Sequence, residues 1–406
     1  MPSALWTDEF LTQQRQLADP LGDAVIREVF DRGDIGALND FMSRLVRDDE
    51  IPADVPEEVR AFLRQTSALP KWACVEKMRA AERLFNIYGG VCLTALVCAS
   101  LPECYTMRIG VRILDLTSQL GVHTNRRLHQ TAAMVLAVMG PSGLEPSGFG
   151  VRQTQKVRLI HAAIRFRILS GLQARATPAA SQEVSGLVPG AVRSVNDVVD
   201  RHGFDWQIDR DGMPINQEDL AFTLLTFGHV IPRGLRTCGV KLSSAEYEAF
   251  LHCWNVVGFG LGVKEELMAH TEADAIELFA RIKSRQAGPS GAGARLTDSL
   301  LRVVETDLLK FPLLRPAAPI LTRMLVGDAT AQMLGLDVRH PGVVHVVHRV
   351  TAVCLRTLQV LLSPLSQPFQ PMTPPAAWLG RKLVNRLCLM TDDGRPRQVA
   401  IPPGWR

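Results

Sequence analysis

Residues 125–139 read NRRLHQTAAMVLAVM, residues 140–150 read GPSGLEPSGFG, and residues 153–170 read QTQKVRLIHAAIRFRILS. The first and third segments carry the apolar period of α-helices, whereas the middle segment gathers glycine and proline. A loop of that composition ends a helix and reverses the chain. The stretch therefore predicts two antiparallel helices.

Two polar side chains lie at equal depth in this helical hairpin. Thr131 lies eight residues before the end of the first helix, and His161 lies eight residues after the start of the second. At a rise of about 1.5 Å per residue, both lie roughly 12 Å from the loop. The long loop lets the two helices stand apart, which leaves room for a ligand between them.

His161 lies between an apolar flank and a basic flank of its helix. At about 100° per residue, the apolar flank holds Val157, Ile164 and Ile168, and the basic flank holds Arg158 and Arg165. Such a histidine suits a haem, which has an apolar macrocycle and a charged propionate edge. An ordinary core histidine shows the same pattern, so the pattern alone leaves both interpretations open.

The helical period continues on both sides of the hairpin. Further helices are expected over residues 22–32, 57–66, 76–99, 108–120, 191–202, 216–230, 243–260, 271–284, 296–309, 319–334 and 343–363. Only Val399–Ile401 has the pattern of a strand. We therefore expect an all-α fold of ten or more helices.

A glycine-rich segment, residues 286–293, predicts a flexible linker. The helices on both sides of it are too apolar to stand alone, because each needs another surface to cover its apolar face. We therefore expect one domain over residues 1–406, with residues 294–406 packed on the same core.

Charge and cysteine usage exclude several classes of protein. The net charge of +4 is spread along the chain, whereas nucleic-acid binding needs clustered Lys and Arg. The eight cysteines form no C-x-x-C pair, which gives no support to zinc ribbons, thioredoxin-like sites or covalently attached haem. Scattered cysteines of this kind fit a reducing cytoplasm.

Targeting signals are not evident in the sequence. Residues 1–16 lack the basic and apolar regions of a secretory signal. The longest apolar stretch, Tyr88–Pro102, has fifteen residues, and a spanning helix needs roughly twenty. We therefore expect a cytoplasmic protein without a transmembrane segment, associated with membranes at most peripherally.

Three weaker motifs do not change this interpretation. His345 and His348 are three residues apart without an evident third metal ligand. In residues 209–212 the glycine is misplaced for an EF-hand, and Asn216 with the acidic residues after it instead predicts a helix N-cap. The glycine-rich residues 258–262 follow a helix rather than a strand, which weakens a dinucleotide interpretation.

The hairpin resembles a known family. RLHQT over residues 127–131 and KVRLIHAAIR over residues 156–165, with His161 thirty residues after Thr131, are similar to the signature of the latex clearing proteins and the wider mpaB-type oxygenases. The resemblance spans about residues 20–285. Further similar segments are residues 23–41, 70–72, 101–103, 214–219 and 247–262.

The resemblance implies specific roles for the residues of the hairpin. It makes His161 the proximal ligand of a b-type haem, places Arg127 and Thr131 on the distal side with Gln130 beside them, and makes Arg158 and Arg165 pocket supports. Rubber-cleaving members carry a lysine where this chain has Gln130. They also use an upstream glutamate, for which Glu103 and Asp115 are the nearest carboxylates here.

These implications lead to one functional hypothesis and several alternatives. We expect an all-α haem b oxygenase with a globin-like haem-binding core, in which Arg127, Gln130 and Thr131 position O2 opposite His161. It would cleave a carbon–carbon double bond of an isoprenoid-like, apolar substrate. The alternatives are a different haem-dependent oxidation, a haem-binding sensor or carrier, and a helical scaffold without haem.

Overall fold

The structure is a computed structural model that describes residues 5–34, 36–38, 55–119, 124–146, 148–176, 204–305 and 317–336. Within these ranges the fold is helical, and the only strand-like pairing is an isolated bridge between Met107 and Ala287. The expected all-α class is therefore confirmed. The expected helices at 191–202 and 343–363, the strand at 399–401, and His345 and His348 lie outside the described residues.

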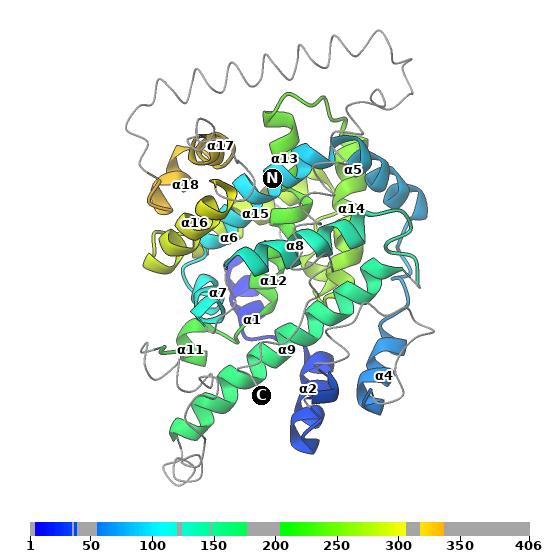
Figure 1. The fold of residues 1–406 in the computed structure, drawn as a ribbon, viewed down its shortest axis with the longest axis vertical. Helices are drawn as coiled ribbons and strands as arrows, with labels where there is room; N and C mark the ends of the chain where they lie inside the picture. The colour runs from blue at the N-terminus through cyan, green and yellow to red at the C-terminus, as the bar shows by residue number, and fades with distance from the viewer. Residues whose placement is uncertain are drawn as a thin grey trace.

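The helical hairpin predicted from the sequence crosses the front of the molecule (Figure 1). It consists of α8 (Thr124–Met139) and the long α9 (Phe149–Ala176), which pack against each other. The loop between them passes very close to the end of α8, since a Cβ at Gly143 would lie 2.1 Å from the Ala137 carbonyl oxygen. Glycine is required there because any side chain would collide with the backbone.

A layer of mainly buried helices lies behind the hairpin and forms the larger hydrophobic core. Its members are α5 (Val75–Ala95), η2 (Leu96–Ser100), α6 (Leu101–Tyr105), α12 (Gln217–Gly228), α13 (Val230–Thr237), α14 (Ser244–Gly260) and α15 (Glu272–Gln286). α14 packs against α5, α9 and α12. This packing joins the rear layer to the hairpin.

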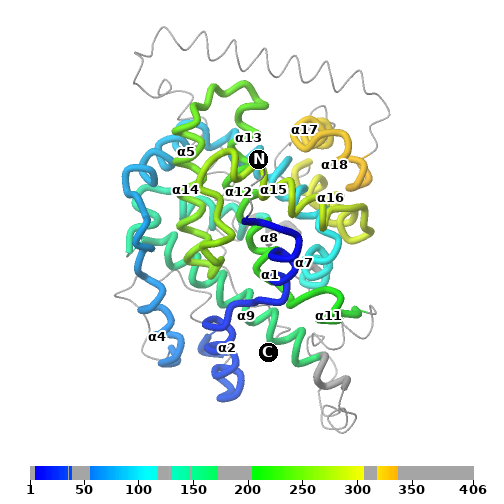
Figure 2. The backbone as a smooth tube through the Cα atoms, turned by 180° about the vertical axis from the view of Figure 1, so that it is seen from behind, coloured from blue at the N-terminus to red at the C-terminus, as the bar shows by residue number. Residues whose placement is uncertain are grey.

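The remaining helices cover the sides of the molecule. α2 (Pro20–Arg32) packs on α9 and on α4 (Glu57–Gln65), with a second apolar cluster between them. On the reverse face, α1 (Asp8–Arg15) lies over α12 (Figure 2). The other elements are α7 (Gly110–Gln119), α11 (Ile208–Asp211), η4 (Glu265–Leu267), α16 (Gly291–Val303), α17 (Ala317–Val326) and α18 (Asp328–Met333).

Side-chain caps fix where several helices begin. Asn216 accepts a hydrogen bond from the Asp219 backbone N–H at the start of α12, as the sequence predicted. Ser243 and Thr271 form capping boxes at the starts of α14 and α15. Each cap satisfies backbone donors that the first helical turn leaves free.

The expected flexible linker at residues 286–293 is instead an ordered connection. The Gly288 N–H donates to the Thr106 carbonyl, and the Arg108 N–H donates to the Gln286 carbonyl. Ser290 caps α16, and a Cβ at Gly293 would lie 2.4 Å from the Tyr105 carbonyl oxygen. The small residues that suggested flexibility serve close packing and capping.

One helical run in the described residues is long and apolar enough to cross a membrane. It comprises α5, η2 and α6 (Val75–Tyr105, 31 residues), which is longer than the fifteen-residue stretch noted in the sequence. In the fold, however, 61% of its apolar window is buried, with α13, α14 and α17 packed against it. A buried core helix passes the same test, so the run does not indicate a membrane span.

Candidate functional site

A mainly apolar cavity of about 330 Å³ lies between the hairpin and the rear layer. Its walls come from α6, α7, α8, α9, α12 and α14, with one residue from α16. Most lining side chains are Leu, Ile, Val, Met and Phe. A concave, mainly apolar cavity of this kind suits an apolar ligand.

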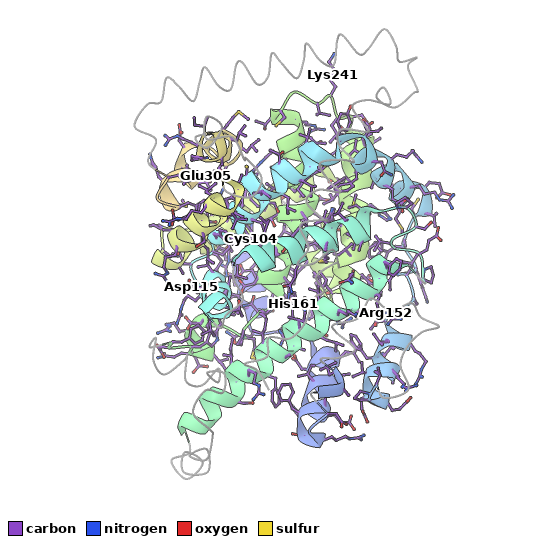
Figure 3. The ribbon with its side chains drawn as sticks, viewed as in Figure 1. Cys104, Asp115, Arg152, His161, Lys241 and Glu305 are labelled. Atoms are coloured by element: carbon purple, nitrogen blue, oxygen red, sulfur yellow. The ribbon has the colours of Figure 1, made fainter. Side chains whose placement is uncertain are left out.

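His161 lines this cavity from the middle part of α9 (Figure 3). Its Nδ1 is buried without a hydrogen-bond partner among the described residues. The pKa of His161 is lowered to about 4, mainly by burial and also by Arg165, while Asp19 opposes the shift. The ring is therefore neutral at pH 7, which is the form that donates a lone pair to a metal.

The described residues offer no other set of ligands for a metal. No group of three or more His, Cys, Asp or Glu side chains that could hold an ion occurs among them. A single neutral imidazole in an apolar cavity suits a metal that brings its remaining ligands with it. A haem does so through its macrocycle.

α8 contributes the expected partners of His161. Gln130 and Thr131 line the same cavity as His161, with Leu128 and Met134 beside them. The sequence placed Thr131 and His161 at the same distance from the loop of the hairpin, and in the structure both line one cavity. Arg127 belongs to α8, but its side chain lies outside the described residues.

The two arginines that flank His161 do not line the cavity. Arg158 holds Asp19 through two hydrogen bonds of 2.7 Å and contacts the Gly260 carbonyl at 3.4 Å. The family resemblance implies that this arginine supports the pocket. Its guanidinium lies against Asp19, the residue before α2, and Arg158 is not among the residues that line the cavity.

Arg165 lies two turns beyond Arg158 along α9 and faces the chain segment before α12. Its Nε donates to Asp23 at 2.8 Å, and its Nη1 donates to the carbonyls of Pro214 and Ile215 at 3.1 and 3.0 Å. Ile215 lines the cavity. Arg165 therefore supports the cavity wall from behind, through the backbone that carries Ile215.

Residues 91–357 match the model of the family described as "ER-bound oxygenase mpaB/B'/Rubber oxygenase, catalytic domain". The match covers well over half of the chain and contains the whole hairpin with His161. The protein belongs to this mpaB/rubber oxygenase family. The resemblance seen in the sequence is confirmed.

Two relatives of the mpaB/rubber oxygenase family cover nearly the whole chain. The rubber oxygenase of Streptomyces sp. (strain K30) is 24% identical over 400 residues, which cover 95% of this chain and 85% of that protein. The solved structure of latex clearing protein in the closed state matches with a TM-score of 0.71 at 22% identity, over 96% of this chain and 95% of that one. This structural match shows that the two chains share a fold.

The acidic residues considered from the sequence lie away from the cavity of this mpaB/rubber oxygenase family member. Glu103 is fully buried and binds Arg233 at 2.8 Å and Lys283 at 2.6 Å. Asp115 binds Arg295 at 2.5 Å. Neither carboxylate is among the residues that line the cavity.

Most of the cavity wall was not identified from the sequence, and two of its residues, Ile215 and Asp219, bear directly on the site. Ile215 has a φ of 53°, which is an outlier for a β-branched residue. Asp219 was interpreted as part of an acidic first turn, which it is, but it also lines the cavity. The only signal for either was their place in the 214–219 segment that resembles the family, and it did not show where their side chains would lie.

Proposed function

We propose that this protein is a haem b-dependent oxygenase that cleaves a carbon–carbon double bond of an apolar, isoprenoid-like substrate. The observation that carries the proposal is His161, a neutral histidine with an unpartnered Nδ1 in the wall of an apolar cavity. Membership of the mpaB/rubber oxygenase family supports the oxygenase chemistry.

The residues present fit a haem held by one axial ligand. His161 would bind the iron, and the Leu, Ile and Val side chains around it would pack on the macrocycle. When bound, haem supplies the binding and activation of O2. Gln130 and Thr131, on the α8 wall of the same cavity, would position the bound oxygen and the substrate by hydrogen bonding.

The reaction needs no external reductant. One O2 molecule and one C=C bond give two carbonyl groups, with one oxygen atom in each. The role of the protein is to exclude water, hold the double bond near the oxygen and fix its orientation. The apolar lining suits an isoprenoid chain, and the names of the two relatives indicate that those proteins act on rubber or latex.

Absorption spectra and oxygen uptake test the proposal together. The purified protein should contain about one non-covalent haem b, because one histidine lines the cavity and no C-x-x-C-H motif occurs. With isoprenoid hydrocarbons and alcohols it should consume O2 and form carbonyl products labelled from 18O2. Uptake of O2 without label in the products would exclude an oxygenase mechanism.

Two histidine variants distinguish the ligand from other buried histidines. His161→Ala should lose haem or hold it loosely. His252→Ala is the matched control, because His252 is a buried histidine that does not line the cavity, and it should keep haem. His129→Ala should keep haem as well. Haem retention by His161→Ala with loss in either other variant would overturn the assignment.

The rival functions make different predictions for the same measurements. A haem sensor or carrier would bind haem and O2 without converting any isoprenoid. A helical scaffold would be colourless even when it is produced with ample haem. A different haem-dependent oxidation would give labelled products that keep the carbon chain intact.

A further inference from the structure

Asp219 places a carboxylate in the wall of the apolar cavity. It is the only acidic side chain among the residues that line the cavity in the described part of the chain. It belongs to the first turn of α12 and lies beside Gly110 of α7, where an added Cβ would lie 3.5 Å from its Oδ2. Because residue 110 has no side chain, α7 leaves space next to the carboxylate.

The existing partners of Asp219 leave part of its acceptor capacity unused. Oδ1 accepts from Arg15 Nη1 at 3.2 Å, and Oδ2 accepts from Asn216 Nδ2 at 3.0 Å. A carboxylate has about four lone-pair sites. The side chain keeps 13% of its surface exposed although it lines an apolar cavity. A ligand without a donor would cover this surface and leave it unsatisfied, which is unfavourable.

The charges around Asp219 favour a neutral donor over a cation. Arg15 contacts Glu218 at 3.1 Å as well as Asp219, and Arg285 contacts Glu218 at 3.0 Å. Arg285 also pairs with the exposed Asp8, which Arg281 contacts too, so the formal charges of the three arginines and three carboxylates cancel. Burial also raises the pKa of Asp219, although Arg15 opposes the shift. An ammonium group would therefore meet no net negative charge, whereas a hydroxyl group needs only an acceptor.

A second polar group in the cavity wall also lacks a partner. Trp254 of α14 lines the cavity, and its indole Nε1 is buried without an acceptor among the described residues. Its ring stacks on Phe227, with centroids 4.6 Å apart. A buried indole N–H usually finds an acceptor. The wall thus offers one unused acceptor and one unused donor, which indicates a ligand that carries polar atoms.

We propose that Asp219 accepts a hydrogen bond from a hydroxyl group of the ligand, and that the cavity therefore selects apolar alcohols, in particular isoprenoid alcohols, over hydrocarbons and ethers of the same shape. This inference rests on the proposed function, because it defines the polar group of the apolar substrate. It adds a recognition residue outside the His161 hairpin.

Binding of a matched pair of ligands tests the inference without turnover. Geraniol and geranyl methyl ether share one chain, and a methyl group replaces the hydroxyl hydrogen in the ether, which removes the hydrogen-bond donor. Calorimetry under argon, on the full chain with its haem content measured first, should show that geraniol binds about 10- to 100-fold tighter, as expected for a hydrogen bond to a charged acceptor. Equal affinities for the two ligands would overturn the inference.

Variants of Asp219 and Asp115 make the test specific. Asp219→Leu should bring the two affinities within about threefold of each other without weakening the binding of the ether. Arg15 keeps Glu218 and the Asp211 carbonyl as partners in this variant, which should therefore fold. Asp219→Asn preserves the shape and should reduce the preference. Asp115→Asn, outside the cavity, should keep it.

The outcomes separate this inference from the proposed function. A preference for geraniol that persists in Asp219→Leu would overturn the role of Asp219, whatever the haem content. A preference that disappears in Asp219→Leu supports it, even in a preparation that binds no haem or takes up no O2. If the preference depends on Asp219 but the protein binds no haem or takes up no O2, the oxygenase proposal fails and the recognition of alcohols stands.

Discussion

Arg165 holds Ile215 in a left-handed backbone conformation. Its Nη1 donates a 3.0 Å hydrogen bond to the carbonyl of Ile215, whose φ is 53°. A β-branched residue adopts this φ only where its surroundings impose it, at a cost of about 1–3 kcal/mol. Because Arg165 lies four residues after His161 on α9, one helix both carries the candidate ligand and fixes the wall of the cavity.

Replacement of Arg165 should destabilise the fold markedly. Arg165→Met keeps the length of the side chain but leaves Asp23 and two backbone carbonyls without their donor. The guanidinium side chain is only 1% exposed, so we expect a loss of about 3 kcal/mol in the free energy of unfolding. Denaturant titration followed by circular dichroism measures it.

Arg64→Met is the matched control for this experiment. Arg64 pairs with Glu57 on α4, and both side chains are more than 60% exposed. An exposed pair contributes about 0–1 kcal/mol, so this variant should remain close to wild type. If Arg165→Met and Arg64→Met both lose only a small amount of unfolding free energy, Arg165 does not hold the 214–215 segment in solution.

The α8 wall should affect turnover more than haem binding. Gln130→Ala and Thr131→Ala remove hydrogen-bonding groups from the cavity but leave His161 in place. Each should keep haem and lower O2-dependent turnover by about tenfold or more, because positioned donors act on charge that develops during the reaction. Arg127→Ala should behave in the same way. Haem content and O2 uptake are measured on the same samples.

Thr297→Ala serves as the control for Thr131→Ala. Thr297 is a buried threonine of α16 that donates to the Gly293 carbonyl and does not line the cavity. Its removal should leave turnover per haem unchanged. Loss of haem from both Arg127→Ala and Thr131→Ala, together with retention in His161→Ala, would mean that the proximal and distal roles are exchanged.

The sequence predicted the elements of the site better than their connections. The helical period and the glycine-rich loop located α8 and α9, so Thr131 and His161 could be expected at one depth. The helical period also placed Arg158 and Arg165 together on one flank of the helix that carries His161. Their partners Asp19 and Asp23 lie 139 and 142 residues earlier in the chain, however, and helical periodicity carries no information on such pairs.

Local patterns also described some residues only in part. Asn216 and the acidic residues after it predicted a helix start, and the structure has one there. That one of these acids, Asp219, turns toward a cavity depends on how α12 packs on α1 and α14 and on the space that Gly110 leaves beside it, which no local pattern encodes. The 286–293 segment misled for a similar reason, because its small residues permit close packing as readily as flexibility.

Acidification should destabilise the protein through buried histidines, and His252 isolates the effect. Its Nε2 accepts the Cys74 N–H at 2.9 Å. Burial lowers its pKa to about 4, with further contributions from Lys77 and His270. Between pH 6.5 and 4 the unfolded chain therefore takes up a proton at this site that the folded chain does not. The contribution of neutral His252 to the free energy of unfolding is therefore fully present above pH 6.5 and is lost as the pH falls toward 4.

The comparison with His252→Gln removes contributions from other groups. Glutamine keeps an acceptor for Cys74 but does not titrate. From pH 8 to pH 4.5, wild type should lose about 2–3 kcal/mol more than the variant in the free energy of unfolding. Carboxyl groups whose pKa is raised, such as that of Asp23, change the free energy of unfolding equally in both proteins, so their contributions cancel in the comparison. Parallel pH profiles of the two proteins would contradict the prediction.

Glu103 should prove to be a structural residue rather than the upstream catalytic glutamate that the sequence resemblance led us to consider. It is fully buried between Arg233 and Lys283 and does not line the cavity. Glu103→Gln leaves two cations against a neutral amide, so we expect a loss of about 3–5 kcal/mol in the free energy of unfolding. Because Glu103 does not line the cavity, the folded fraction should keep the haem content of wild type. Its turnover per haem should stay within about twofold of wild type, which corresponds to less than 0.5 kcal/mol in the activation barrier.

Asp115→Asn is the control for the size of the stability effect. Its partner Arg295 is 62% exposed, so this variant should lose about 1 kcal/mol or less in the free energy of unfolding. A Glu103→Gln protein of wild-type stability that binds haem but does not turn over would identify Glu103 as catalytic, and would require a conformation in which its carboxylate leaves Arg233 and Lys283 for the cavity.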